Sequence, residues 1–256
     1  MLIDSHCHLD RIDLTPYQHE FSGFMDEVEA QQIEHLLCIS IDLEAYPAMV
    51  DLVSGYKQIS VTVGVHPNVK DGKDPSVEEL ISLGSPKNAI GIGETGLDYF
   101  RSEGDLAWQH QRFRNHIQAA KTLKKPLIIH TREAQVDTLR ILKEEGAEEV
   151  GGIIHCFTED WDFAQKAMDL NFFISFSGIV TFNNATTIKE VAKKVPFDRF
   201  LIETDSPYLA PIPFRGRPNY PTYVKYVAQH IADLRGVSIN KIANQSTDNF
   251  YNLFRL

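Results

Sequence analysis

The chain has 256 residues, of which 43% are hydrophobic and 23% charged, and its formal net charge at pH 7 is -10. This composition predicts an ordinary globular protein. The acidic charge argues against a general nucleic-acid coat protein, although it allows an enzyme with a local basic rim. Three widely spaced cysteines in apolar runs predict reduced thiols and a cytoplasmic location, and no apolar run is long enough to span a membrane.

Short apolar runs alternate with helix-like segments along the whole chain. The runs are rich in β-branched residues and predict strands at 2–8, 35–41, 59–65, 89–93, 126–129, 151–154, 172–176 and 200–202. The segments between and after them have apolar residues at helical spacing and predict helices at 21–34, 43–56, 76–83, 105–123, 134–145, 160–170, 186–195, 220–234 and 238–254.

Eight strand–helix units in a chain of this length predict an α/β protein, a single (β/α)8 TIM-barrel domain that covers residues 1–256. The strands are apolar on both faces, as parallel strands covered by helices are. A doubly wound open sheet is the alternative. However, the first strand–helix turn, at 5–8, has no glycine-rich phosphate loop. The glycines at 91, 93 and 96 imitate a dinucleotide motif, but the first two lie inside a predicted strand and no helix follows directly.

Metal-binding residue types stand at the carboxyl ends of six predicted strands. In a barrel these ends share one face, and His6 and His8 point to the same side because strand side chains alternate. The residues concerned are His6, His8, His66, Glu94, His130, His155, Glu203 and Asp205. Any one of them could be structural, as we expect of the other five histidines, but together they predict a metal site.

The number of candidate ligands predicts two metal ions. Four histidines and two carboxylates exceed what one tetrahedral zinc needs, since a catalytic zinc takes three protein ligands and a water. Two divalent ions sharing a carboxylate accommodate them and suit hydrolysis. These ligand types do not select among Zn, Mg and Mn.

Motifs at these strand ends resemble those of one family. They are S-H-C-H-L-D at 5–10, G-V-H-P at 64–67, G-E-T-G-L-D-Y at 93–99, I-H-T-R at 129–132, H-C-F at 155–157 and E-T-D-S-P-Y at 203–208. Together they resemble the TatD family of metal-dependent deoxyribonucleases, which belongs to the amidohydrolase-like barrels. The resemblance implies a (β/α)8 barrel, divalent metals and hydrolysis of DNA phosphodiesters, with 3′-to-5′ exonuclease activity in some members.

The resemblance also implies a role for each residue. His6, His8 and Asp205 would hold one metal, His130 and His155 the other, and Glu94 would bridge the two. Asp205 would also accept the proton of the attacking water, with Glu203 acting beside it, and His66 would contact the substrate phosphate. The chain departs from the family pattern at Tyr220, where similar proteins have a glutamate.

The mechanism we expect is metal-assisted attack of water on phosphorus, with basic side chains near the phosphates. Arg132, Arg215 and Arg217 follow strand ends and are the candidates for phosphate contacts. The aromatic candidates for stacking on unpaired bases are Tyr99, Phe157, Trp161 and Tyr208. A recessed barrel mouth favours single-stranded DNA or frayed ends, and we expect a monomer.

Two other functions fit the same residues. One is an ester or amide hydrolase on the same barrel, such as a D-aminoacyl-tRNA deacylase. Many of the amide, lactone and ester hydrolases use a modified lysine on strand four as the bridge, whereas this chain has Glu94. The other is a metal-holding scaffold without turnover, which would not need an open water position.

Overall fold

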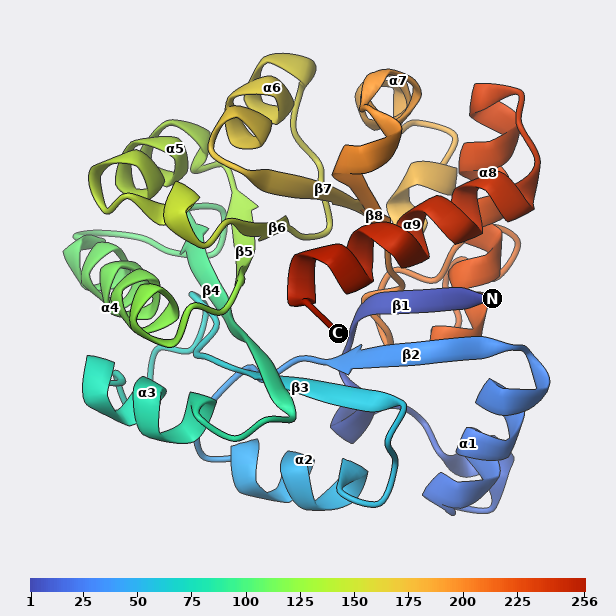
Figure 1. The fold of residues 1–256 in the computed structure, drawn as a ribbon, viewed down its shortest axis with the longest axis horizontal. Coiled ribbons are helices and arrows are strands. Elements are labelled where there is room, and N and C mark those ends of the chain that lie inside the picture. Colours follow the sequence, from blue (N-terminus) through green and yellow to red (C-terminus); the bar gives the residue numbers. More distant parts are fainter.

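The computed structural model describes residues 1–256 and contains one parallel sheet of eight strands in sequence order. The sheet curves into a barrel (Figure 1). Its strands are β1 (Leu2–Cys7), β2 (Ile33–Cys38), β3 (Ile59–Val63), β4 (Ala89–Asp98), β5 (Leu127–Arg132), β6 (Gly152–Ile154), β7 (Phe172–Phe176) and β8 (Phe200–Ile202). The predicted (β/α)8 TIM barrel is therefore confirmed.

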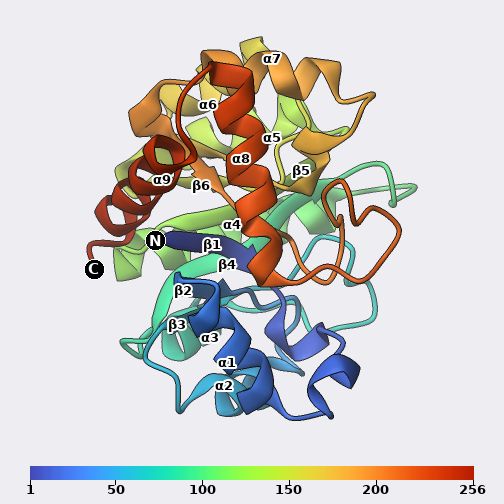
Figure 2. The same cartoon turned by 90° about the vertical axis from the view of Figure 1, so that its right-hand side faces the viewer.

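Helices surround the barrel and alternate with the strands (Figures 1 and 2). They are α1 (Phe21–Ala30), α2 (Tyr46–Val53), α3 (Val77–Gly84), α4 (Ala107–Leu123), α5 (Gln135–Glu144), α6 (Trp161–Asp169), α7 (Thr186–Lys194), α8 (Val224–Arg235) and α9 (Ile239–Phe254). None of them is both long and apolar enough to cross a membrane.

Backbone hydrogen bonds join the last strand to the first, just beyond the end of β8. The Asp205 amide donates to the carbonyl of His6 at 2.9 Å, and the His8 amide donates to the carbonyl of Ser206 at 2.8 Å. Residues nearly 200 positions apart in the chain thus become neighbours at one edge of the barrel.

Strand β4 is longer than the sequence predicted. It continues past Glu94 to Asp98, and its second half pairs with β5, with Gly96 opposite His130 and Asp98 opposite Arg132. All ten residues of β4 are buried. Gly93 and Gly96 interrupt the apolar pattern, so the second half of the strand is not recognised as an apolar run. The close approach of β4 to the backbone of β5 nevertheless requires glycine at these two positions.

Helix α9 closes the amino-terminal end of the barrel (Figure 1). Phe250 and Phe254 of this helix pack against a cluster of apolar side chains inside the barrel. The other residues of the cluster lie on the strands, except Ile39, which is one residue beyond β2; they are Ile3, Leu37, Ile39, Ile90, Ile128, Ile153, Phe173 and Leu201. A second, larger core of 52 residues includes the apolar faces of α1–α8. With one end filled, only the opposite end, where the strands finish, has room for a site.

Candidate metal centre

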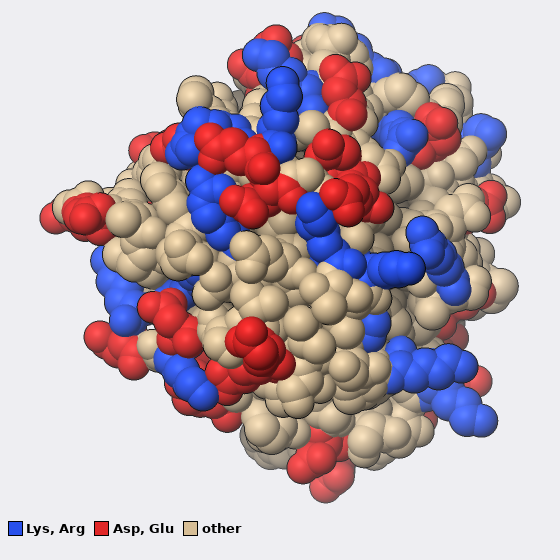
Figure 3. Space-filling view, turned by 60° about the vertical axis from the view of Figure 1, so that its left-hand side comes forward, with Lys and Arg blue, Asp and Glu red and all other residues tan.

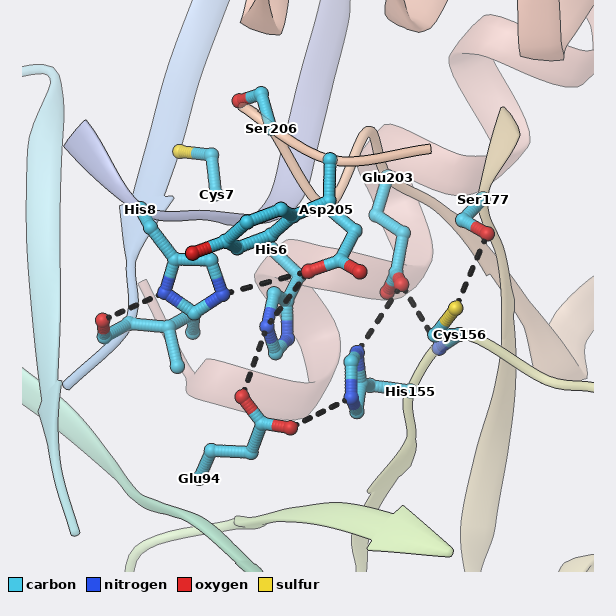
Figure 4. A network of polar contacts seen from close by, with 12 residues as sticks. His6, Cys7, His8, Glu94, His155, Cys156, Ser177, Glu203, Asp205 and Ser206 are labelled. Atoms are coloured by element: carbon cyan, nitrogen blue, oxygen red, sulfur yellow. Dashed lines mark hydrogen bonds and ion pairs between the residues drawn. The ribbon is translucent and has the colours of Figure 1, made fainter. Parts of the chain in front are cut away.

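The predicted strand-end residues meet at the open end of the barrel. A cavity of about 920 Å³ lies there and is lined by His8, His66, Glu94, His130, His155 and Asp205, among others. His6 and Glu203 lie just beneath it and are fully buried. Figure 4 shows Glu94 on one side of His6 and His155, with Asp205 on the other side.

Glu94 is the centre of the cluster, and its two carboxylate oxygens face different histidines. Oε2 lies 3.3 Å from Nε2 of His6. Oε1 lies 2.8 Å from Nε2 of His155 and 3.2 Å from Nδ1 of His130. The side chain is only 2% exposed. A carboxylate placed in this way can hold one ion with each oxygen.

Asp205 faces the two histidines of β1. Its Oδ1 lies 3.3 Å from Nε2 of His8 and 3.7 Å from Nε2 of His6. The side chain of Cys7 points to the other side and donates to the Leu37 carbonyl, as strand alternation predicts. Asp205 has a φ of 57°, a backbone conformation that is uncommon outside glycine and that aspartate tolerates better than most residues. The strand-closing hydrogen bond to His6 holds it there.

In three histidines, the hydrogen bond of the ring nitrogen that faces away from the cluster determines which nitrogen carries the proton. Nδ1 of His8 can only donate to the carbonyl of Ile39, at 3.1 Å. Nε2 of His130 faces the Asp98 carboxylate at 3.0 Å, and Nδ1 of His155 faces Glu203 at 3.2 Å. In each ring the other nitrogen then presents a lone pair to the Glu94–Asp205 cluster. This arrangement is typical of metal-binding histidines.

His66 has the opposite orientation. Its Nδ1 accepts a hydrogen bond from the backbone amide of Asn68 at 3.0 Å, so the proton of the neutral ring is on Nε2. Nε2 points toward Oε1 of Glu94 at 3.3 Å. Although His66, Glu94 and His130 are close enough to hold an ion together, a protonated Nε2 donates and does not ligate. This geometry suits a contact with an anionic group of a substrate.

Burial and neighbouring charges act in opposite directions on the pKa values of the cluster. Burial alone would raise the pKa of Glu94, but His155 and His66 hold that pKa well below its usual range. Burial would lower the pKa of His155, but Glu94 and Glu203 raise it well above its usual range. The two carboxylates around His155 therefore favour a positive charge at this position. A bound cation would supply that charge and would compete with a proton for Nε2, as metal binding generally does.

Several buried polar atoms of the cluster have no hydrogen-bond partner. They include Nδ1 of His6 and Oε2 of Glu203, while Nε2 of His6 and Nε2 of His155 face the Glu94 carboxylate without a regular hydrogen bond. An unpaired polar atom in a protein interior is costly, and such atoms converge here around two carboxylates. Imidazole nitrogens and carboxylate oxygens are the donor atoms that divalent ions take. The residues therefore fit a metal centre.

Close backbone packing brings Glu94 and His130 together. A Cβ atom at Gly96 would lie 2.1 Å from the carbonyl oxygen of His130, and Gly96 has a φ of +135°. A Cβ atom at Gly93 would lie 2.5 Å from the carbonyl oxygen of Ile128. Only glycine fits at these two positions, so the glycines on both sides of Glu94 set the distance between β4 and β5.

Asp98 is a residue of this centre to which the sequence analysis gave no role. Its Oδ2 faces Nε2 of His130 and also accepts a hydrogen bond from Nδ2 of Asn68, both at 3.0 Å. Its Oδ1 accepts from the amide of Arg101 at 2.9 Å. Asp98 lies four residues after Glu94 on the same strand, so alternation would place it on the same face. The shortened prediction for this strand concealed that signal.

Glu203 lies where it can orient His155, beneath the cavity. Its Oε1 accepts hydrogen bonds from Nδ1 of His155 and from the amide of Cys156, at 3.2 Å and 2.8 Å. The side chain is 0% exposed. Glu203 thus acts on the centre through His155, and substrate cannot reach it directly.

The structure brings one of the three predicted phosphate-binding arginines to the cavity. Arg132 lines it, together with Arg11 and Arg101, which the sequence analysis did not select. Arg215 and Arg217 are exposed on the loop after β8 and do not line the cavity. The guanidinium of Arg215 instead lies over the ring of Phe182, at 4.3 Å.

Of the four residues predicted to stack on bases, the structure places one at the cavity. Tyr208 lines the cavity and is 48% exposed. Phe157 is in the core, Trp161 packs against the core, and the hydroxyl of Tyr99 is hydrogen-bonded to Asp137 at 2.7 Å. None of these three lines the cavity.

Tyr220, the departure from the family pattern, is buried away from the cavity. Its hydroxyl donates to the carbonyl of Asp13 at 3.1 Å. The preceding residue, Asn219, donates through Nδ2 to the carbonyl of Thr204 at 2.9 Å and so supports the loop that carries Asp205. Tyr220 therefore has a packing role that leaves the centre unchanged.

A (β/α)8 barrel with histidines and carboxylates converging at the carboxyl ends of its strands is the architecture of metal-dependent barrel hydrolases. The model of one such family, TatD related DNase, matches residues 3–255. The chain belongs to this family.

Relatives of known sequence support the assignment over the full length. The uncharacterized metal-dependent hydrolase YcfH of Escherichia coli K12 is 44% identical, and the match covers 100% of this chain and 96% of the relative. The uncharacterized metal-dependent hydrolase YabD of Bacillus subtilis is 41% identical, with 100% of both chains covered. The crystal structure of YJJV, a TatD homolog from E. coli K12, superposes with a TM-score of 0.90 at 25% identity and covers 100% of this chain and 98% of its own.

Proposed function

We propose that this protein is a metal-dependent phosphodiesterase that hydrolyses DNA, with two divalent ions held at the barrel mouth. The observation that carries the proposal is the position of Glu94, whose Oε2 faces His6 while its Oε1 faces His130 and His155. One ion would be held by His6, His8 and Asp205, the other by His130 and His155, with Glu94 shared between them. The family description, TatD related DNase, supports DNA as the substrate.

Divalent ions bound at this centre would lower the pKa of a water and offset the negative charge of the reacting phosphate. The side chains supply the rest. Asp205 is the proton acceptor because it lines the cavity and is ionised: burial opposes its ionisation, but His8, His6 and His155 outweigh burial and lower its pKa. Nε2–H of His66 donates to a non-bridging phosphate oxygen, where negative charge increases during the reaction.

Two buried carboxylates keep the ligands in position. Glu203 orients His155 and Asp98 orients His130, each by a hydrogen bond to the ring nitrogen that faces away from Glu94. Arg132 and Arg101 at the cavity wall give the otherwise acidic protein a local positive charge. Acidic and basic side chains are interspersed on the face shown in Figure 3, without a continuous basic surface. Because they line the cavity and Arg215 and Arg217 do not, Arg132 and Arg101 are the better candidates for phosphate contacts.

The shape of the cavity favours an unpaired end of DNA. The centre is recessed at the bottom of a cavity of about 920 Å³, with Glu94 only 2% exposed. A flexible single strand can enter such a cavity, whereas a stiff base-paired duplex cannot bend its backbone down to the buried Glu94. We therefore propose a single strand or a frayed end as substrate, shortened from the 3′ end.

The test follows nucleotide release from single-stranded oligonucleotides labelled at the 3′ or the 5′ end. Metal-stripped protein would be assayed alone and after addition of Mg, Mn or Zn. Stepwise shortening from the 3′ end that requires metal is expected. Asp205→Asn should reduce the rate by about 10²- to 10⁴-fold, the usual contribution of a positioned proton acceptor. Asp162→Asn, on the exposed face of α6, is the matched control.

Metal binding without cleavage of any oligonucleotide would refute the proposal. Ester and amide substrates would then be tested on the same preparations. Cleavage by Asp205→Asn at the normal rate would refute the role of Asp205 but leave the nuclease activity in place.

A further inference from the structure

An exposed aromatic ring lies beside the metal cavity and has no packing role that explains its position. Phe100, two residues beyond the end of β4, is 54% exposed. Only a few large apolar side chains of this protein are exposed to a similar extent, and the ends of the chain account for two of them, Met1 and Leu256. A phenylalanine left in water forgoes the free energy that its burial would provide. What distinguishes Phe100 from the other exposed apolar side chains is its contact with Arg132, which lines the cavity.

A guanidinium group covers this ring. The central carbon of the Arg132 guanidinium lies 3.7 Å from the centroid of the Phe100 ring, which is the distance of a cation–π contact. The planar ring and the planar guanidinium group present flat surfaces on which a third planar group can stack. We call this pair the Phe100–Arg132 platform.

The Phe100–Arg132 platform has a rigid connection to the proposed metal ligands. Arg132 follows His130 by two residues on β5, so both side chains lie on one face, about 7 Å apart along the strand. Arg132 pairs in register with Asp98, and the carbonyl of Arg132 accepts a hydrogen bond from the amide of Tyr99 at 3.0 Å. The platform therefore stands at the cavity wall, at a fixed distance from the centre.

The positive charges of Arg132, in the platform, and of Arg101, next to it, are not paired with carboxylates. Arg11, also at the cavity, is 3.4 Å from Asp42, and Arg112 on α4 is 2.6 Å from Asp74. By contrast, the guanidinium groups of Arg132 and Arg101 form no ion pair. Both line the cavity, and Lys70 adds a positive charge nearby through its bond to the carbonyl of Arg101 at 3.2 Å. Two of the acidic residues of the cavity wall are Glu133 and Glu159, and Gln135 donates a hydrogen bond to the latter.

We propose that the Phe100–Arg132 platform stacks on an unpaired base of the substrate, next to the phosphodiester that is cleaved. In this arrangement Arg101 contacts a backbone phosphate. Aromatic rings and arginine side chains are the groups on which single-stranded nucleic acids stack, and such stacking tolerates any base because every base has a flat face. This inference rests on the proposed nuclease function and adds the subsite that selects unpaired DNA.

The test compares substrates with and without the base that would be stacked. The intact substrate is a single-stranded oligonucleotide. Its counterparts carry one abasic residue at successive positions from the 3′ end. Each is cleaved by wild type, Phe100→Ala, Phe100→Leu and Phe100→Tyr. Leu256→Ala, which also removes an exposed apolar side chain but at the end of the chain, is the matched control.

Loss of stacking should appear in KM. Phe100→Ala and Phe100→Leu should raise KM for intact DNA by about 5- to 150-fold, because stacking contributes about 1–3 kcal/mol per base. Phe100→Tyr, which keeps an aromatic ring, should leave KM near the wild-type value. With an abasic residue at the stacked position, the ratio of the Phe100→Ala and wild-type KM values should fall toward one. This dependence on a single base would not arise from a structural role of Phe100.

Two results would refute the platform. One is the same KM for wild type, Phe100→Ala and Phe100→Leu on intact DNA. The other is an increase in KM that stays the same wherever the abasic residue is placed. Either result, with cleavage by wild type preserved, removes the subsite and leaves the proposed function. Absence of cleavage by wild type would refute the function itself, and the subsite with it.

Discussion

Replacement of Asp98 by asparagine tests whether the hydrogen bond between Asp98 and His130 supports metal binding at the centre. Asp98 is 1% exposed, and its carboxylate accepts from His130, Asn68 and the amide of Arg101. Asparagine has the same shape but replaces one acceptor oxygen by an NH₂ group. Since Oδ2 faces two donors and Oδ1 faces one, the NH₂ group will turn toward the Arg101 amide. His130 keeps an acceptor, which is now neutral.

The size of the effect follows from the charge that is lost. A hydrogen bond to an ionised group contributes about 1.5–3 kcal/mol and one between neutral groups about 0.5–1.5 kcal/mol. The contact with His130 thus loses about 1–1.5 kcal/mol, which corresponds to metal binding weakened by about 5- to 15-fold. This range overlaps the 10- to 100-fold typical of residues that orient metal-binding histidines.

The assay is competition between the protein and a chromogenic chelator for Zn or Mn. If two ions bind, only the step that involves His130 should weaken in Asp98→Asn, and the step that involves His6, His8 and Asp205 should not change. Asp162→Asn provides the control for loss of a carboxylate elsewhere. Equal affinities of Asp98→Asn and wild type in both steps would show that Asp98 does not support the centre.

Two further predictions concern stability and packing. Burial lowers the pKa of His116 from 6.5 to about 4 in the folded protein, so the unfolded chain takes up this proton first as the pH falls. Stability should therefore decrease between pH 6.5 and pH 4, by about 3 kcal/mol from this residue. Urea unfolding of metal-free His116→Gln should show a shallower pH dependence than wild type, and equal slopes would contradict the prediction. Gly96→Ala should reduce metal binding by more than tenfold or prevent folding, because its Cβ would overlap the His130 carbonyl. Gly55→Ala, in open space, should match wild type in both circular dichroism and metal content, and a Gly96→Ala protein that does the same would refute the packing argument.

Most of the candidate centre could be predicted from the sequence, because barrel topology needs little more than the order of the elements. Once eight apolar runs alternate with helices, their carboxyl ends share one face. His130 and His155 could then be grouped although 25 residues separate them. The prediction failed where a pattern was interrupted. Glycines in β4 concealed its second half, and with it Asp98.

The outer part of the site could not be predicted, since an arginine or aromatic residue after a strand has no periodic signal. Arg132 is the last residue of β5 and lines the cavity, whereas Arg217 lies far along the loop after β8 and does not. The conformation of that loop decides where Arg217 lies. The same is true of Tyr99 and Phe100, which are neighbours in the chain: Tyr99 is tied to Asp137, and Phe100 is left in water under Arg132.

The sequence by itself thus determined the barrel, the family motifs and the set of potential metal ligands, because periodicity and strand alternation are local properties of the chain. Only the tertiary structure decided which nitrogen of each histidine faces the cluster, because that depends on partners such as Asp98, Glu203 and Asn68. It also decided which side chains reach the cavity. Contacts between residues distant in the chain set those directions, and no local pattern encodes them.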